Sequence, residues 1–332
     1  MKLLFNTSFR LAEPQRLEFQ AIWPGIEIVE QSVGSPDQLD GTGVDALVTE
    51  QVPRNLEGWS KLRWVQLLSA GANQLLDHPI QKAPIPVTTA SGTHGVPIAQ
   101  FVTCTWLMMA HRMPQLLEFK STRTWPNRLS LAGFTVRGRT AGILGYGSIG
   151  RECARQLSAL GMRVVCLKRD PASRTDEGYN AWPGTGDSPG AIPSTWYGPG
   201  QLDEMLGACD LLVVTVPSTP QTEGMIGRRE FGRMKPGARM IVVSRGGIVV
   251  EEALAEALRN GQIAGAVVDC YGREPLPPEH FFFDVPHLIM APHMSGVFDG
   301  FWPLLVGLVG ENLRRLRAGR PLLNATSPQN GY

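Results

Sequence analysis

Residues 140–170, TAGILGYGSIGRECARQLSALGMRVVCLKRD, decide the fold that this 332-residue chain is expected to adopt. The apolar run at 140–144 predicts a buried strand and leads directly into the pattern GxGxxG at Gly145, Gly147 and Gly150. In dinucleotide-binding proteins the first glycine permits a tight turn and the second lets the backbone approach a pyrophosphate. The third lets the following helix pack against the strand. The pattern in this context predicts a turn that binds dinucleotide phosphates.

The segment after the turn indicates which dinucleotide is bound. An amphipathic helix is expected over 151–160 and a second strand over 163–167. An acidic residue about 20 positions after the glycines normally binds the ribose 2′-hydroxyl of NAD. Lys168 and Arg169 stand at that place instead, and two cations attract a 2′-phosphate that a carboxylate would repel. The sequence therefore favours NADP over NAD, with a merely solvated basic strand end as the alternative explanation.

Short apolar runs separated by helix-length segments extend this pattern along the chain. They lie at 211–216, 240–244, 265–269 and 288–290, and in the first hundred residues at 2–5, 46–48, 64–67 and 86–89. Buried parallel strands have this character. The later series, with the two strands already named, has the six strands of a complete doubly wound nucleotide-binding sheet. The earlier series indicates a second parallel α/β domain.

Two helices and one long interruption complete the expected organisation. Apolar patterns predict a long helix over 96–112 and another over 302–316, which Gly319 ends. Residues 171–200 are rich in Pro, Gly, Ser and Thr and show no periodic apolar pattern. We expect them to form a long surface loop, which either modifies cofactor affinity or is simply tolerated length.

The composition excludes several classes of function. The formal net charge is +1, without a long basic run, so neither nucleic acid nor a membrane is an expected partner. The cysteines, Cys104, Cys153, Cys166, Cys209 and Cys270, show no CxxC spacing. Their scatter predicts reduced thiols and neither a disulfide framework nor a metal site. The apolar run near the amino terminus is too short for a signal-peptide core, and we expect a cytoplasmic protein.

Three ionisable residues follow predicted strands in the second half of the chain. Arg245, Glu274 and His293 each come shortly after one of the last three strands. Open α/β sheets bind their ligands at the carboxyl ends of the strands. A single Arg, Glu or His is most often solvated or structural, but three of them at one edge of a sheet indicate a catalytic site.

Four motifs occur in one order: GYGSIG at 145–150, SRGG at 244–247, DCYGREPLP at 269–277 and PHMSG at 292–296. In these motifs the chain resembles the D-isomer-specific 2-hydroxyacid dehydrogenase family. Weaker matches are SAGA at 69–72, SGTHG at 91–95 and VPSTPQT at 216–222, so the resemblance covers nearly the whole chain. The run RGGIVVEE and the Lys-Arg pair are most similar to the NADPH-preferring glyoxylate/hydroxypyruvate reductase branch.

The resemblance implies an NAD(P)-dependent 2-oxo acid reductase and a role for each of the three residues. His293 would donate a proton to the carbonyl oxygen as hydride arrives, and would accept a proton in the reverse reaction. Glu274 would hydrogen-bond the other ring nitrogen of His293 and orient the ring. Arg245 would bind the substrate carboxylate and polarise the carbonyl group.

The resemblance also implies two sets of contacts. Backbone amides of Ala70, Gly71 and Ala72 would receive the substrate carboxylate beside Arg245. The cofactor would meet the glycine turn and the ends of several strands, including one residue near the nicotinamide. These cofactor residues are Tyr146, Gly147, Ser148, Ile149, Lys168, Arg169, Val216, Pro217, Ser244 and, near the nicotinamide, Asp269.

The implied architecture is α/β, with two doubly wound parallel-sheet domains. A flavodoxin-like substrate domain would comprise residues 1–107 and 298–332, and a Rossmann nucleotide-binding domain residues 108–297. The active site would lie in the cleft between them, open to a small 2-oxo or 2-hydroxy acid. Members of the family are usually homodimers through the nucleotide domain, and we expect the same here.

Some aromatic and histidine residues outside the motifs have two interpretations. Trp125, Phe298 and Trp302 either line the substrate pocket or belong to the core, where aromatics of amphipathic segments more often lie. His94 and His111 are interpreted as structural.

Two other functions share this fold. A nucleotide-sensing, corepressor-like binding protein would show weak turnover and a defined peptide partner. A formate- or phosphite-type dehydrogenase would reduce the cofactor irreversibly without any 2-hydroxy acid.

Overall fold

The computed structural model describes residues 1–326, which form two compact units. The first unit comprises Met1–His94, Gly178–Pro183 and the described residues from Phe298 onwards. The second unit comprises Gly95–Glu177 and Gly184–Val297. Residues 327–332, which the sequence assigned to the substrate domain, lie outside the described residues. Each unit contains one parallel sheet with helices, so the expected fold class is confirmed.

The sheet of the second unit has seven parallel strands in the order β12-β11-β10-β9-β6-β7-β8. The strands are β6 (Thr140–Leu144), β7 (Arg163–Leu167), β8 (Thr195–Tyr197), β9 (Leu211–Val214), β10 (Arg239–Val242), β11 (Gly265–Val268) and β12 (Leu288–Met290). The order reverses between β6 and β9, as in doubly wound nucleotide-binding sheets, which bind their ligand at that point. All six strands that the sequence predicted here are present.

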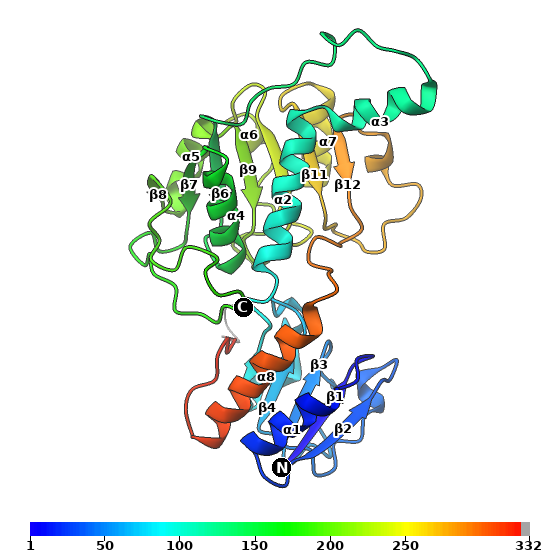
Figure 1. The fold of residues 1–332 in the computed structure, drawn as a ribbon, viewed down its shortest axis with the longest axis vertical. Helices are drawn as coiled ribbons and strands as arrows, with labels where there is room; N and C mark the ends of the chain where they lie inside the picture. Colours follow the sequence, from blue (N-terminus) through cyan, green and yellow to red (C-terminus); the bar gives the residue numbers. More distant parts are fainter. Residues whose placement is uncertain (327–332) are drawn as a thin grey trace. The chain divides into compact units, whose positions relative to one another are not determined.

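Helices cover both faces of this sheet (Figure 1). On one face lie α2 (Gly95–Ala110) and α4 (Ser148–Ala159). On the other lie α5 (Leu202–Ala208), α6 (Arg228–Phe231) and α7 (Glu251–Arg259). Because both faces are covered, the strands are apolar throughout rather than alternating. Helix α3 (Met113–Thr122) follows α2 and has no buried residue.

The first boundary between the units falls after His94, whereas the sequence placed it at residue 107. The reason lies in the packing of α2. Its residues Val102 and Trp106 belong to the same core cluster as Ile143 of β6. The apolar pattern of a helix shows that one face is buried, but not which sheet covers it.

The first unit has five parallel strands in the order β2-β1-β3-β4-β5, the flavodoxin-like order. They are β1 (Lys2–Asn6), β2 (Glu27–Gln31), β3 (Ala46–Thr49), β4 (Trp64–Leu67) and β5 (Val87–Thr88). Helices α1 (Glu13–Ile22) and α8 (Phe301–Arg317) pack with the sheet in one core cluster. Short 3-10 turns and loops cover the other face, where they form a second cluster.

Residues 171–200 are not the plain surface loop that the sequence suggested. They include β8, which extends the sheet beside β7, and their middle part groups with the first unit. The buried Arg151 donates hydrogen bonds to the carbonyl oxygens of Arg174 and Asp187. These anchors are long-range polar contacts, which leave no periodic pattern in the sequence.

Candidate active site

The glycine turn between β6 and α4 has the geometry that a dinucleotide needs. A Cβ on Gly150 would lie 2.2 Å from the carbonyl oxygen of Gly145, so only glycine lets the helix approach the strand this closely. A Cβ on Gly147 would meet nothing within 4 Å, and Gly147 is the N-cap of α4. The amino-terminal amides of α4, with their partial positive charge, thus lie beside free space suited to a pyrophosphate.

Tyr146, the residue between the first two glycines, has a structural side chain. It is 2% exposed, and its hydroxyl donates a 2.7 Å hydrogen bond to Asp187 Oδ2. Burial and the carboxylate of Asp187 raise the pKa of Tyr146 above its ordinary value, which keeps the hydroxyl protonated. The guanidinium of Arg151 lies 4.8 Å from the ring centroid. Any cofactor contact of Tyr146 is therefore left to its backbone.

Lys168 and Arg169 follow β7, where the sequence expected them. Lys168 donates its backbone N–H to Tyr197 O at 3.0 Å and its ammonium to Ser173 O. Burial, followed by the charge of Arg151, lowers the pKa of Lys168. A bound anion would relieve the repulsion between these cations. Arg169 is exposed.

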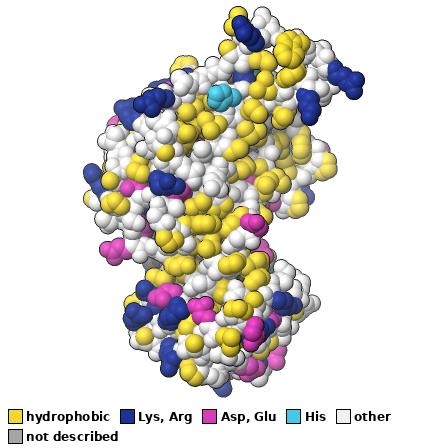
Figure 2. Space-filling model, in the orientation of Figure 1, with side chains coloured by type: hydrophobic (Ala, Val, Ile, Leu, Met, Phe, Trp, Pro, Cys, Tyr) yellow, Lys and Arg dark blue, Asp and Glu magenta, His cyan; other side chains and the backbone are white. Residues whose placement is uncertain are grey.

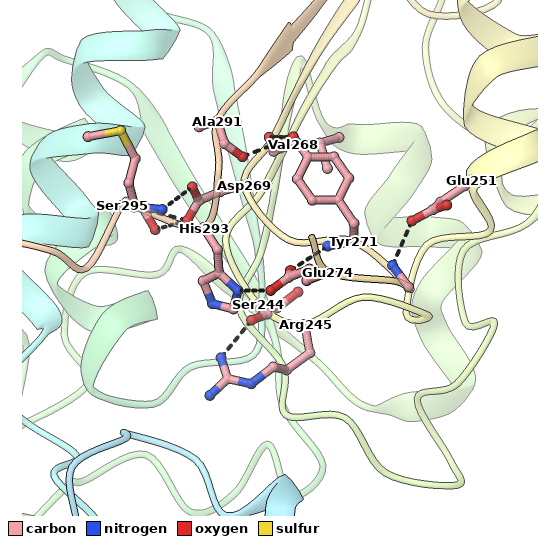
Figure 3. A network of polar contacts seen from close by, with 12 residues as sticks. Ser244, Arg245, Glu251, Val268, Asp269, Tyr271, Glu274, Ala291, His293 and Ser295 are labelled. Atoms are coloured by element: carbon pink, nitrogen blue, oxygen red, sulfur yellow. Dashed lines mark hydrogen bonds and ion pairs between the residues drawn. The ribbon is translucent and has the colours of Figure 1, made fainter. Parts of the chain in front are cut away.

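His293, the expected proton donor, and Glu274 lie side by side in the second unit (Figure 3). His293 Nδ1 lies 2.7 Å from Glu274 Oε2. The other oxygen of this carboxylate accepts the backbone N–H of Tyr271 at 2.9 Å, so the carboxylate is fixed from both sides. His293 Nε2 has no hydrogen bond to any residue between 1 and 326. One ring nitrogen is thus oriented and the other is open for proton exchange.

Arg245 follows β10 and is half-buried. Its Nη1 donates to the carbonyl oxygen of Ser244 at 2.8 Å (Figure 3), and no carboxylate in the described part of the chain pairs with it. The remaining N–H donors can therefore bind a carboxylate in the forked geometry that guanidinium favours. A Cβ on Gly246 would lie 2.0 Å from the carbonyl oxygen of Tyr271. That close approach holds the Arg245 turn against the loop of Glu274.

Two further expected cofactor residues, Ser244 and Asp269, differ in whether their side chains are already hydrogen-bonded within the chain. The hydroxyl of Ser244 is buried and has no hydrogen-bond partner among the described residues. Such an orphaned group fits contact with a cofactor that the chain itself does not supply. Asp269 is 1% exposed, and both its oxygens accept hydrogen bonds from Met294 and Ser295. Its place in the site is thus beneath the His293 loop.

The remaining expected contacts lie on the loops that the sequence indicated. Val216 follows β9, and its backbone nitrogen would lie 2.9 Å from a Cβ on Gly145, so it shapes the glycine turn. Ser148 and Ile149 lie within the glycine motif, at the start of α4, and Pro217 directly follows Val216. In the first unit, residues 70–72 follow β4, and Ser69 Oγ donates to Gly71 O at 2.6 Å. Ala72 is buried.

Trp125, Phe298 and Trp302, which the sequence left as either pocket or core residues, differ in their surroundings. Trp302 stacks on Phe9 with ring centroids 4.7 Å apart, and both are partly buried and pack against the core cluster of the first unit. Phe298 contacts the rings of His94 and Trp182 within the same unit. Trp125 is 92% exposed. His94 Nδ1 lies 2.9 Å from Thr93 Oγ1.

Sequence reasoning missed two residues that support the site. Asp187 lies in the segment interpreted as a plain loop, and it binds Tyr146 of the glycine turn. Glu251, the first residue of α7, accepts the backbone N–H of Gly272 at 2.8 Å. Neither has a local signal, because each acts through a residue more than 20 positions away.

Other site types find no support in the described residues. Nowhere between residues 1 and 326 do three or more His, Cys, Asp or Glu residues form a group that could hold a metal ion. Within the same range, every helix is too short or too polar to span a membrane.

The chain is similar to known proteins in sequence and in fold. Residues 104–295 match the family model of the D-isomer specific 2-hydroxyacid dehydrogenase NAD binding domain. The chain is 30% identical to glyoxylate reductase of Thermococcus gammatolerans, over 90% of this chain and 86% of that protein. A D-3-phosphoglycerate dehydrogenase of Archaeoglobus fulgidus is 29% identical over 73% of this chain, which spans only 43% of that relative.

A solved structure extends the likeness to the whole chain. The NADPH-dependent glyoxylate/hydroxypyruvate reductase of Sinorhizobium meliloti, in complex with NADP and sulfate, superposes with a TM-score of 0.79. It is 25% identical, and the match covers 100% of this chain and 99% of that one.

Proposed function

Because the chain belongs to the D-isomer specific 2-hydroxyacid dehydrogenase family, we propose that it reduces a small 2-oxo acid to the D-2-hydroxy acid with NADPH. NADH is the less favoured cofactor. The observation that carries this proposal is the 2.7 Å contact between His293 and Glu274. Arg245, which pairs with no carboxylate among residues 1–326, follows a strand at the same edge of the nucleotide sheet. To reduce a 2-oxo acid with a bound cofactor, the protein must bind the substrate carboxylate and donate a proton to the carbonyl oxygen.

The residues divide the reaction as follows. When bound, NADPH supplies the hydride that adds to C2 of the substrate. Arg245 binds the carboxylate and thereby fixes the carbonyl group and stabilises the charge that develops on its oxygen. His293 donates the proton from Nε2 to that oxygen, while Glu274 stabilises the ring through Nδ1. In the reverse direction Nε2 accepts the hydroxyl proton.

The preference for NADPH rests on Lys168 and Arg169. Their charges, at the end of β7, suit a 2′-phosphate and cannot accept from a 2′-hydroxyl as a carboxylate would. The Sinorhizobium meliloti enzyme to which this chain is similar was solved with NADP. The half-buried Lys168 beside Arg151 further favours an anion at this place.

Replacing both residues with serine tests this preference. In the Lys168→Ser, Arg169→Ser variant we expect the NADPH KM to rise by about 10–100-fold, because two charge-assisted hydrogen bonds are lost. The NADH KM should change by less than about 3-fold, since no 2′-phosphate is present. Steady-state kinetics with both cofactors measures the two values. Lys61→Ser, an exposed change in the first unit, is the control, and equal rises for both cofactors would contradict the assignment.

A substrate panel tests the function itself. Oxidation of NADPH and NADH is followed by absorbance with glyoxylate, hydroxypyruvate, pyruvate, and branched and aromatic 2-oxo acids. We expect turnover with NADPH, and the best substrate reports the size of the pocket. Measurable NADPH binding without turnover of any 2-oxo acid would overturn the proposal and favour a nucleotide-sensing protein.

We also infer that the chain forms a homodimer through its second unit. The segment 113–135, which includes α3, carries the apolar side chains Leu117, Trp125 and Leu129, exposed by 61%, 92% and 75%. Hydrophobic atoms are visible over α2 and α3 in Figure 2. Exposed apolar groups of this size on one segment mark an interaction surface. In a symmetric dimer the second copy of the chain presents the same segment, so the two exposed segments cover each other.

Introducing charge into this segment should separate the subunits. For Trp125→Asp, Leu129→Asp we expect a monomer at micromolar concentration, because burying two carboxylates is unfavourable. Light scattering coupled to size exclusion gives the mass. Leu76→Asp, at an exposed leucine of the first unit, should leave the dimer intact. A wild-type monomer, or a dimer that survives the double change, would rule out this surface.

A further inference from the structure

Two carboxylates outside the proton-donor pair hold the two loops that carry it (Figure 3). We propose that Asp269 and Glu251 are positioning residues: Asp269 fixes the loop of His293, and Glu251 fixes the loop of Glu274. The proposal rests on the proposed function, because it concerns the same proton donor. It adds a positioning task to the nicotinamide contact that the resemblance implied for Asp269, whose carboxylate has about four acceptor positions and uses three of them here.

Asp269 lies at the carboxyl end of β11 and binds the two residues that follow His293. Its Oδ1 accepts the N–H of Met294 at 2.7 Å. Its Oδ2 accepts the N–H of Ser295 at 3.0 Å and also the hydroxyl of Ser295. Three donors thus converge on one carboxylate that is almost completely buried. The charge of a buried carboxylate is stabilised mainly by such hydrogen bonds.

The conformation of His293 shows why an anchor is needed. Its φ angle is +53°, in the left-handed region that residues other than glycine rarely adopt. Such a conformation persists only when the surrounding structure enforces it. The hydrogen bonds from the next two residues to Asp269 provide this constraint immediately after His293. Without them the loop is free to relax, and the ring moves away from Glu274.

Glu251 anchors the loop of Glu274 in the same way that Asp269 anchors the loop of His293. Its Oε1 accepts the N–H of Gly272 at 2.8 Å. Its Oε2 lies 3.3 Å from His280 Nε2. Gly272 and His280 enclose the segment that presents Glu274, so one carboxylate at the start of α7 ties both ends of it. The 2.7 Å contact between Glu274 and His293 therefore depends on two anchors from separate elements.

The experiment is a double-mutant cycle on kcat. Asp269→Asn and Glu251→Gln are each combined with His293→Ala, and residual rates are measured with enzyme in excess over substrate. Each single variant should lower kcat by about 10–100-fold, since a misplacement of 1 Å has effects of this size. In the His293→Ala background neither change should lower the rate further, because a positioning residue acts only through the group it positions.

Cofactor affinity separates positioning from direct contact. The NADPH Kd of Asp269→Asn is measured beside kcat at saturating NADPH: loss of a direct contact weakens the Kd, whereas loss of positioning lowers kcat with NADPH already bound. Losses of kcat at saturating NADPH that add to that of His293→Ala would overturn the proposal and leave Asp269 a cofactor ligand only. If Asp269→Asn does not fold, Ser295→Ala removes one donor to the same carboxylate and is measured instead. Glu252→Gln, at the exposed neighbour of Glu251, is the matched control and should retain wild-type kcat.

A measurement without turnover distinguishes failure of this proposal from failure of the proposed function. Amide hydrogen exchange is followed by NMR in the wild type and the two single variants. Faster exchange is expected at Met294 and Ser295 in Asp269→Asn, and at Gly272 in Glu251→Gln. Unchanged exchange at these amides would overturn the anchoring even if the enzyme reduces 2-oxo acids. If the wild type reduces no 2-oxo acid, the proposed function is wrong, but the exchange rates still show whether the two carboxylates anchor the loops.

Discussion

His293→Ala should lower kcat for 2-oxo acid reduction by about 10³-fold, the contribution of a well-placed general acid. The variant retains Arg245 and the glycine turn, so the NADPH Kd should not change. The reason is geometric: Nε2 is the nitrogen left open by the bond between Nδ1 and Glu274, and alanine removes the proton donor that we propose at that place. Steady-state rates and nucleotide binding by fluorescence give the two quantities.

A second histidine supplies the control for this prediction. His111 lies exposed just beyond α2, and His111→Ala should keep the wild-type rate. If His293→Ala were as active as the wild type, the proton would come from elsewhere and the proposed mechanism would be wrong. A loss of NADPH binding would instead indicate a role of His293 in the cofactor site.

The nucleotide unit was largely predictable because its signals are local. The strand at 140–144, the glycine turn and the strand at 163–167 are each determined by adjacent residues, and the structure places both strands at those bounds. The edge strand β2 (Glu27–Gln31) was missed, since it is partly exposed and has only two apolar residues, Ile28 and Val29, between polar ones. Edge strands, covered less than central ones, carry a weaker apolar pattern.

In the candidate site, too, the features with a local signal could be predicted and those that depend on long-range contacts could not. Residue type and position after a strand identified Arg245, Glu274 and His293, because the carboxyl edge of a parallel sheet collects such residues. The two anchors of the pair could not be predicted. Glu251 and Asp269 act through backbone amides of glycine, methionine and serine, and a backbone donor leaves no mark in a sequence. The anchoring that we propose for Asp269 therefore rests on its three hydrogen bonds.

Arg245→Gln is the second substitution for which we expect a large effect, and it should weaken the use of the 2-oxo acid rather than the binding of NADPH. Two charge-assisted hydrogen bonds to a carboxylate are lost, so we expect kcat/KM for the 2-oxo acid to fall by about 10²–10⁴-fold. The NADPH Kd should remain close to the wild-type value. Arg245→Lys keeps the charge but not the planar fork, so it should recover only part of the loss.

Two comparisons decide whether Arg245 binds the carboxylate or merely supports its turn. Arg273→Gln removes an exposed guanidinium from the loop of Glu274 and should leave kcat/KM unchanged. Added guanidinium ion should partly restore Arg245→Ala, because a free cation can occupy the vacated position and bind the same carboxylate. If Arg245→Gln affected charged 2-oxo acids and their uncharged amides equally, the arginine would not recognise the carboxylate. A selective loss with the acids is the result that the unpaired guanidinium beside β10 leads us to expect.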